Sequence, residues 1–250
     1  MEKRYARDNK YYQEIDIPCY DTDASFRLKP ASFMDLAQEL AYWAASELGF
    51  GFDDLQDHGT AWVLSRMHIH VADAPRWRES VRLATWHKGL DGLFFMRDFR
   101  MSSPDGRERV ACTSSWLVVD ARTHHLVRSD RLEGLVQEET QCREDALPQA
   151  CPKIQLPAGA PVEPCGSRTV SYSDIDILGH TNNARYIVWA MDALPYARTS
   201  TAVVKDIFIN FNKETRPGDL VELFTVQSAE ADYVEGRVDG HPVFIAQFLW

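Results

Sequence analysis

The feature that most limits how this chain can fold is a weak internal duplication. In each half a short acidic loop precedes an apolar run of helical periodicity, and four segments of alternating apolar and polar residues follow. A shift of 153 positions places Asp174 on Asp21, and a shift of 140 positions places Ile209 on Ile69. The sequence therefore predicts one helix-and-strand unit that occurs twice.

The two apolar runs are predicted to be the central helices of these units. The first begins at Pro30, which suits the first turn of a helix, and ends before Gly49, which suits a C-terminal cap. The second run, NNARYIVWAMDAL, is stopped by Pro195. An apolar helix buries its surface when a sheet wraps around it. We therefore expect an α+β fold, a tandem pair in which each half is a long central helix wrapped by a curved antiparallel β-sheet.

The other periodic segments give the predicted strands and the boundary between the units. Residues 148–165 hold five prolines and no apolar period, which is typical of an extended connector. We expect an N-terminal unit over residues 1–147, this proline-rich linker, and a C-terminal unit over residues 166–250. The predicted strands cover residues 62–75, 78–86, 94–103 and 109–121, and then 201–214, 218–226, 231–238 and 241–250.

Composition narrows the functional classes. The formal net charge of −10 would repel nucleic acid and acidic membrane surfaces, so neither is an expected partner. No apolar run is long enough to span a membrane, and the N-terminal residues lack the apolar centre of a signal peptide, so we expect a cytoplasmic protein. The five cysteines form no CxxC pair and are expected to be free thiols. No cofactor is expected.

Basic residues could still form a local docking site for an acidic partner. Two groups are candidates, and both are also compatible with ordinary solvated surface: Lys3, Arg4, Arg7 and Lys10, and Arg97, Arg100, Arg107 and Arg109.

The duplication fails where polar residues occur in the second unit only. At the shift of 153 His180 falls on Arg27, and at the shift of 140 Glu214 falls on Ala74. Groups suited to catalysis are therefore expected in the second unit, which leaves the first unit free to line a binding cavity.

The loop that contains His180 suits acyl chemistry. Asp176 and His180 flank a turn in which Gly179 permits a positive backbone angle, and Thr181 or Asn182 can cap the following helix. Unpaired amides at a helix start attract negative charge, and a carboxylate beside them can attack a carbonyl or activate water. A plain turn with a helix cap is the alternative interpretation.

Glu214 is a second candidate because it follows the alternating strand IFINF, whose end can approach the start of the helix. Its carboxylate can hold a water molecule or the imidazole of His180, and a solvated charge before a turn is the alternative. His68 and His70 alternate along a strand, but no third ligand accompanies them, so no metal site is expected.

Several stretches together resemble one enzyme family. The run from Asp176 to Tyr186, DILGHTNNARY, resembles the signature of hotdog-fold thioesterases. The stretches AWVLSRMHIHVADAPRW, ATWHKG, MRDFRM, TSSWLVVD and INFNKETRPGD are similar, in order, to those of the acyl-acyl-carrier-protein thioesterases in their bacterial form, over residues 12–248. The resemblance implies a double hotdog fold and hydrolysis of the thioester that joins a fatty acyl chain to the phosphopantetheine of acyl carrier protein.

The resemblance also implies roles for individual residues. It carries over Asp176, His180 and Glu214 as catalytic residues, and Asn182 is expected to help to fix their arrangement. Leu178 stands where many members have asparagine, and Thr215 stands where plant members have cysteine, so a mechanism driven by a carboxylate rather than a thiol is expected. The expected substrate contacts, with the acyl chain between helix and sheet of the first unit, are Asn183, Thr215, Phe33, Met34, Leu64 and Met67.

Three other functions stay open at this point. The same hydrolysis of acyl-coenzyme A is the nearest, followed by a hydratase or dehydratase on a similar fold and by an acyl-binding protein without catalysis. The sequence also leaves open whether the protein is a monomer or a homodimer.

Overall fold

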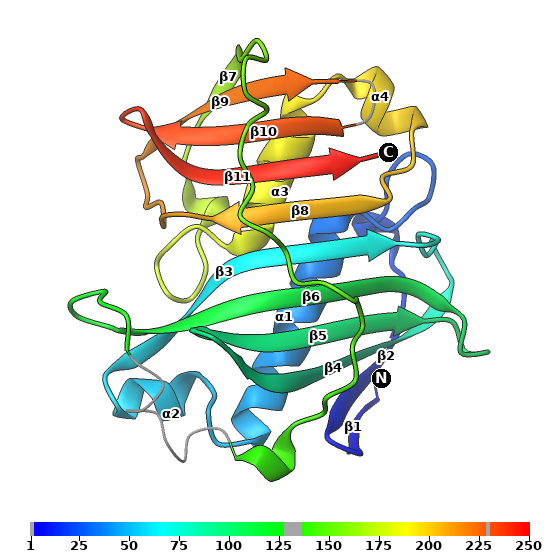
Figure 1. Cartoon of the computed structure of the whole chain (residues 1–250). Coiled ribbons are helices and arrows are strands. Elements are labelled where there is room, and N and C mark those ends of the chain that lie inside the picture. The colour runs from blue at the N-terminus through cyan, green and yellow to red at the C-terminus, as the bar shows by residue number, and fades with distance from the viewer. Residues whose placement is uncertain (1–2, 128–136, 229–230) are drawn as a thin grey trace.

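The computed structural model describes residues 3–127, 137–228 and 231–250, and it forms a curved sheet wrapped around helices (Figure 1). The helices are α1 (Pro30–Glu47), α2 (Phe52–Asp57), α3 (Asn183–Ala193) and α4 (Tyr196–Thr201). The strands of the first half are β1 (Arg4–Arg7), β2 (Lys10–Asp16), β3 (Thr60–Val71), β4 (Ser80–Asp91), β5 (Phe94–Ser102) and β6 (Glu108–Asp120). Those of the second half are β7 (Glu163–Thr169), β8 (Asp206–Phe211), β9 (Leu220–Gln227), β10 (Ala231–Val238) and β11 (His241–Leu249).

The order of the strands confirms the duplication. The sheet runs β1-β2-β4-β5-β6-β3-β8-β11-β10-β9-β7. Read toward the centre of the sheet, the order β2-β4-β5-β6-β3 of the first half corresponds to the order β7-β9-β10-β11-β8 of the second half. The halves meet where β3 pairs with β8 in antiparallel register, with Met67 opposite Ile209 and Ile69 opposite Ile207. Helices α1 and α3 pack against each other on the inner face of the sheet. The predicted tandem α+β arrangement is therefore confirmed.

Both central helices begin and end where the local sequence predicts. Pro30 occupies the first position of α1, and Gly49, with φ of +75°, follows its C-cap Leu48. The face of α1 toward the sheet is buried and becomes alanine-rich toward its C-terminal half. Helix α3 ends two residues before Pro195. No helix within the described ranges is long and apolar enough to cross a membrane.

The proline-rich segment runs along the outer face of the sheet (Figure 1). The N–H of Ile154 donates to Asn210 Oδ1 at 2.7 Å, and the Asn210 amide nitrogen donates to the Pro152 carbonyl at 3.0 Å. Cys151 and Ile154 pack with Ile245 in a small cluster outside the main core. The segment is therefore fastened to β8 and β11, and its last residues enter β7.

Candidate active site

The loop before α3 is a tight, internally hydrogen-bonded turn. The N–H of Asp176 donates to the His180 carbonyl at 3.0 Å, and the N–H of Gly179, with φ of +78°, donates to the Asp176 carbonyl at 3.1 Å. The Asp176 carboxylate accepts a hydrogen bond from the N–H of Leu178 at 2.9 Å. This bond fixes the direction of the carboxylate. The turn itself is solvent-accessible, with Ile177 81% exposed and Leu178 44% exposed.

The start of α3 adds hydrogen-bond donors beside that carboxylate. Asn182 Oδ1 accepts from the N–H of Ala184 at 2.9 Å, so Asn182 is the N-cap, one of the two predicted residues. The N–H of Asn183 donates no hydrogen bond to any described residue. An unpaired amide in the first turn of a helix favours negative charge beside it.

His180 and Glu214 meet across two loops. His180 Nε2 lies 3.4 Å from Glu214 Oε2, and their side chains are 23% and 37% exposed, respectively. Glu214 is thus a neighbour of the imidazole, which is one of the two positions predicted for it. The residues that follow strand IFINF therefore approach the start of α3, as the sequence predicts.

A buried cluster of hydrogen-bonded hydroxyl groups joins those two loops. Thr215 Oγ1 is hydrogen-bonded to Thr181 Oγ1 at 2.7 Å and to the Tyr186 hydroxyl at 2.9 Å. Its N–H donates to the Tyr186 hydroxyl at 3.1 Å, and its carbonyl accepts from the N–H of Thr181 at 3.0 Å. Thr215 is fully buried, so its place is between the two loops rather than on a substrate-facing wall.

A cavity of about 800 Å³ opens beside the Asp176 carboxylate and extends into the first half. Asp176, Asn182 and Asn183 line it at one end, and it continues between the C-terminal half of α1 and strands β3 to β6. Trp62 and Trp116 form part of its wall. The cavity therefore connects the acidic loop of one half to the interior of the other.

The apolar walls of this cavity differ from those expected. Phe33, Met34, Leu64 and Met67 are all buried in the core, and none of them lines the cavity. The physical reason is the position along α1 and β3. The cavity begins one turn after Met34 on α1, at Gln38, and touches only the first residues of β3. Its walls come instead from Tyr42, Ala45, Phe50, Leu55, Trp62, Phe95 and Trp116.

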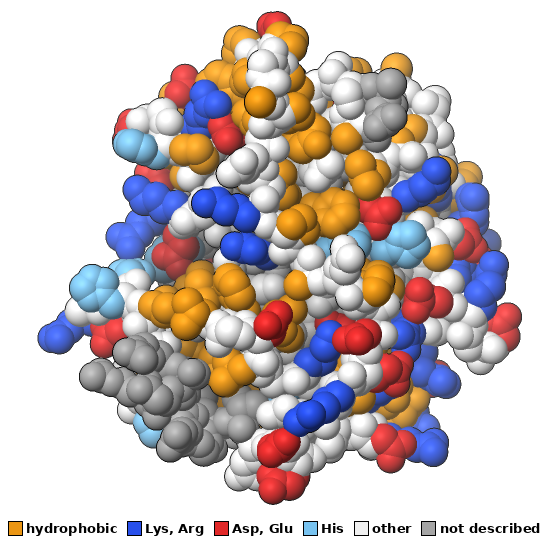
Figure 2. All heavy atoms as spheres, viewed as in Figure 1, with side chains coloured by type: hydrophobic (Ala, Val, Ile, Leu, Met, Phe, Trp, Pro, Cys, Tyr) orange, Lys and Arg blue, Asp and Glu red, His pale blue; other side chains and the backbone are white. Residues whose placement is uncertain are grey.

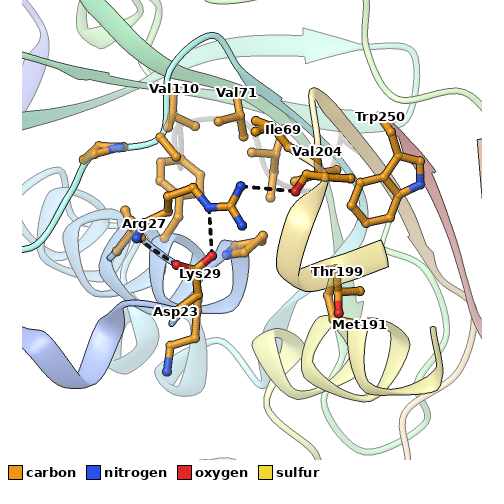
Figure 3. A pocket seen from close by; sticks show the side chains of 17 residues that line it. Asp23, Arg27, Lys29, Ile69, Val71, Val110, Met191, Thr199, Val204 and Trp250 are labelled. Carbon is orange, nitrogen blue, oxygen red and sulfur yellow. Dashed lines mark hydrogen bonds and ion pairs between the residues drawn. The ribbon is translucent and has the colours of Figure 1, made fainter. Parts of the chain in front are cut away.

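The corresponding place in the first half is nearly closed (Figure 3). Asp23 and Arg27, which the duplication equates with Asp176 and His180, form an ion pair at 2.9 Å. Arg27 also donates to the Ala202 carbonyl at 3.2 Å. The pocket that remains there measures about 50 Å³, and Phe33 lines it. The first half has kept the loop, but the pocket beside its Asp23–Arg27 pair is too small for an acyl chain.

Most of the predicted basic clusters are not free to bind a partner. Arg97 and Arg109 are buried, and Arg109 binds Asp73 and Glu79, because both side chains belong to strands inside the sheet. Lys10 and Arg100 are ion-paired with Glu144. Basic and acidic side chains are interleaved over the face of the molecule shown in Figure 2.

Two other basic residues lie beside the site. Lys213 and Arg216 are exposed, flank Glu214 in sequence and form no ion pair with any described residue. Since both belong to the loop that carries Glu214, they lie close in sequence to the His180–Glu214 pair.

His68 and His70 point to one acceptor rather than to a metal. His68 Nε2 and His70 Nδ1 lie 2.8 and 2.9 Å from Asp206 Oδ1 across the seam between β3 and β8. Burial acts to raise the pKa of Asp206, but the hydrogen bonds from both histidines outweigh it and hold the pKa below its usual value. Among the described residues no group of histidine, cysteine and carboxylate side chains is arranged to hold a metal ion.

Comparison with known families gives two matches that together cover most of the chain. Residues 8–131 match the acyl-ACP thioesterase N-terminal domain, and residues 166–240 match the acyl-ACP thioesterase C-terminal domain.

Curated relatives are similar at low identity. The chain is 24% identical over 242 residues to oleoyl-acyl carrier protein thioesterase 1, chloroplastic, of Arabidopsis thaliana, which covers 90% of this chain and 66% of that protein. It is 23% identical over 232 residues to the palmitoyl-acyl carrier protein thioesterase, chloroplastic, of Gossypium hirsutum, covering 89% and 56%. The chain thus spans less than two thirds of the length of either plant protein.

Solved structures show the same fold. The acyl-ACP thioesterase from Bacteroides thetaiotaomicron superposes with a TM-score of 0.78 at 24% identity, over 96% of this chain and 97% of that one. The 12:0-ACP thioesterase from Umbellularia californica superposes with a TM-score of 0.87 at 18% identity, over 98% of both chains. The fold is therefore a tandem hotdog.

Proposed function

Because the chain belongs to the acyl-ACP thioesterase family, we propose that it hydrolyses the thioester of a fatty acyl-acyl carrier protein and releases the free fatty acid. Water adds to the acyl carbonyl, the carbon–sulfur bond breaks, and the phosphopantetheine thiol takes up a proton. The observation that carries this proposal is the cavity of about 800 Å³ that begins at the Asp176 carboxylate and continues into an aromatic and aliphatic interior. A carbonyl at its mouth can meet an acidic group while an acyl chain fills the rest.

Asp176, Asn182 and Asn183 line the cavity, His180 and Glu214 do not, and each of the five has a role that its contacts support. The free N–H of Asn183 can stabilise the oxyanion that develops on the thioester oxygen. Asp176, oriented by the N–H of Leu178, supplies the carboxylate. His180 and Glu214, 3.4 Å apart, can hold and orient the attacking water. Asn182 caps α3 and so positions both the amide and the loop.

Two routes are compatible with this arrangement, and an isotope experiment detects the second when water attacks the Asp176 side of its intermediate. Asp176 either removes a proton from water or attacks the carbonyl to form an anhydride that water then opens. A single turnover in water labelled with oxygen-18 places the label in the fatty acid alone by the first route. By the second route, attack of water on the acyl side of the anhydride also labels the fatty acid, whereas attack on the Asp176 side labels the carboxylate. Mass spectrometry of the peptide containing Asp176 therefore identifies the second route whenever that side is attacked.

The experiment that tests the function is release of free thiol from a panel of acyl thioesters. We expect turnover of carrier-bound acyl chains, with a higher kcat/KM than for the same chains on coenzyme A. Equal or greater activity on coenzyme A would assign the enzyme to that substrate class. Loss of enoyl absorbance without thiol release would indicate a hydratase, and saturable binding without turnover would indicate an acyl-binding protein.

A further inference from the structure

A guanidinium group lies inside the acyl cavity. Arg97 is on β5, on the strand face that points toward α1, and it is 7% exposed and lines the cavity. Its Nη1 donates to Thr85 Oγ1 at 3.2 Å, and the Thr85 hydroxyl in turn donates to the Asp98 carbonyl at 3.0 Å. The bond to Thr85 is the sole hydrogen bond that its guanidinium makes to described residues. Several of its five N–H donors are therefore available to a ligand.

No acidic side chain in the described ranges forms an ion pair with Arg97. The two carboxylates that line the same cavity are Asp176, at the mouth, and Glu39, which binds Arg4 at 2.9 Å. Burial lowers the pKa of Arg97 to about 10, so the guanidinium remains protonated at neutral pH. A buried charge without a partner is unfavourable, and filling its surroundings with hydrocarbon makes it more so.

His87 on β4 adds a second polar group at the same place. It is 6% exposed and lines the cavity, and its Nε2 lies 2.9 Å from Thr140 Oγ1. The Thr140 hydroxyl donates to the Gln137 carbonyl at 2.7 Å, so it must accept from the histidine. Nδ1 of His87 is then an acceptor. Burial, with the charge of Arg97 as a second cause, lowers the pKa of His87 to about 4, so the ring is neutral at pH 7.

This polar pair lies on the far side of the cavity from the acidic loop. The loop is tied to the end of β8, and β5 is three strands away in the order β8-β3-β6-β5. Three spacings of about 4.8 Å give ~14 Å. An acyl chain held at Asp176 therefore approaches Arg97 with its distal end. On α1, Ala41 and Ala45 leave space over this part of the sheet.

We propose, resting on the thioester hydrolysis proposed above, that Arg97 and His87 form a distal subsite. It favours acyl chains that carry an oxygen near their far end over chains that end in a methyl group. A hydroxyl can donate to His87 Nδ1 and accept from Arg97, and a carboxylate can accept two bonds from the guanidinium. A terminal methyl that reaches the same point displaces water from Arg97 and leaves its N–H groups without acceptors.

Binding of unreactive analogues tests the subsite without depending on hydrolysis. Acyl-pantetheine amides that end in methyl, hydroxyl or carboxylate are compared by calorimetry at several chain lengths. The Kd of an oxygen-bearing ligand should be at least about tenfold lower than that of the methyl ligand, a difference of about 1.4 kcal/mol. This preference should appear only when the chain is long enough to reach β5. Equal or weaker binding of the oxygen-bearing ligands at every length overturns the proposal.

Substitutions identify the residue responsible. Arg97→Met should abolish the preference, and Arg97→Lys, which keeps the charge, should retain part of it. The matched control is Arg107→Met, a substitution of the same kind at a side chain that is 61% exposed outside the cavity. An unchanged preference in folded Arg97→Met overturns the proposal. A distal preference in a protein that releases no thiol supports the subsite while refuting hydrolysis, and binding of none of the ligands refutes both.

Discussion

Asp176 is the residue on which the proposed chemistry depends most directly. Replacing it by asparagine keeps an oxygen that can accept the Leu178 N–H and removes only the charge. We expect Asp176→Asn to lower kcat for thiol release by about 10²- to 10⁴-fold while the unfolding temperature changes little. Asp105→Asn is a close control, because Asp105 Oδ1 accepts the N–H of Arg107 two residues later in an exposed turn. Near-normal hydrolysis by Asp176→Asn would refute the assignment.

His87 should make the protein sensitive to mild acid. Its pKa is about 4 in the folded protein, mainly because of burial, against 6.5 for an unperturbed histidine. The unfolded chain therefore takes up a proton that the folded one does not. Above pH 6.5 the neutral His87 costs the folded state nothing through this linkage. As the pH falls from 6.5 toward 4, the free energy of unfolding decreases by about 3 kcal/mol in total.

Urea unfolding between pH 7.5 and 4.5 measures this effect. The free energy of unfolding should fall less steeply in His87→Gln than in the wild type, and exposed His58→Gln should follow the wild type. Parallel curves for His87→Gln and the wild type would contradict the pKa.

Local sequence signals located some residues of the site but could not locate others. Gly179 in its positive-φ turn and the cap residue Asn182 follow from preferences that act within a few residues. Arg97 was expected on the surface, because a strand pattern does not show which charged side chain points inward. Its burial depends on the alanines of α1, which are distant in sequence. No local sequence pattern identifies His87 as a residue of the site, because residues distant in sequence determine its environment.

At the scale of elements, the hydroxyl cluster around Thr215 determines whether the two loops keep His180 beside Glu214. Thr215→Val preserves the shape of the side chain and leaves the hydroxyls of Thr181 and Tyr186 without their shared partner. We expect a loss of about 1–3 kcal/mol in stability together with lower kcat.

Thr215→Ser should restore most of both properties, because the hydroxyl returns. Thr201→Val, which removes an exposed hydroxyl bonded to the Ala197 carbonyl, is the control and should have little effect on catalysis. Full activity and stability in Thr215→Val would show that the hydroxyl cluster does not position the loops.

Every element that the sequence predicted has a buried face, although strand β2, in which Tyr11 and Ile15 are buried, was not predicted. Helices α1 and α3 and the eight strands that flank them show periodicity, because one side of each meets the core. Edge strand β7 gave no such pattern, since all of its residues are exposed and Pro164 interrupts its ladder. Its place depends on pairing with β9, which is a contact distant in sequence.

The whole molecule should unfold as one unit. Strands β3 and β8 join the halves in one continuous sheet, and α1 packs against α3. We expect a single urea transition that is identical by fluorescence and circular dichroism. Fragments 1–147 and 166–250 expressed separately should aggregate or stay unfolded, because each exposes the edge of β3 or β8 and one side of its helix. Two independent transitions would contradict this coupling.

Exposed charge near the site should affect the hydrolysis of acyl chains bound to a carrier protein more than the hydrolysis of small thioesters. Lys213 and Arg216 are exposed cations beside the site in a chain whose net charge is −10. We expect the double variant Lys213→Gln and Arg216→Gln to lower kcat/KM for carrier-bound acyl chains by about tenfold at low salt. Hydrolysis of a small uncharged thioester should not change, and exposed Lys153→Gln is the control. An equal loss on both substrates would mean that the residues act on catalysis itself.

The Asp23–Arg27 ion pair that fills the counterpart of the site has an evolutionary consequence. In a pair of identical subunits every substitution is made twice, so a change that improves the reaction centre also alters the mirrored position. Here the two positions are encoded separately. One copy can be altered to suit a new acyl group while the other keeps the ion pair that links Arg27 to Asp23, so natural or laboratory variation has twice as many independent sites to act on.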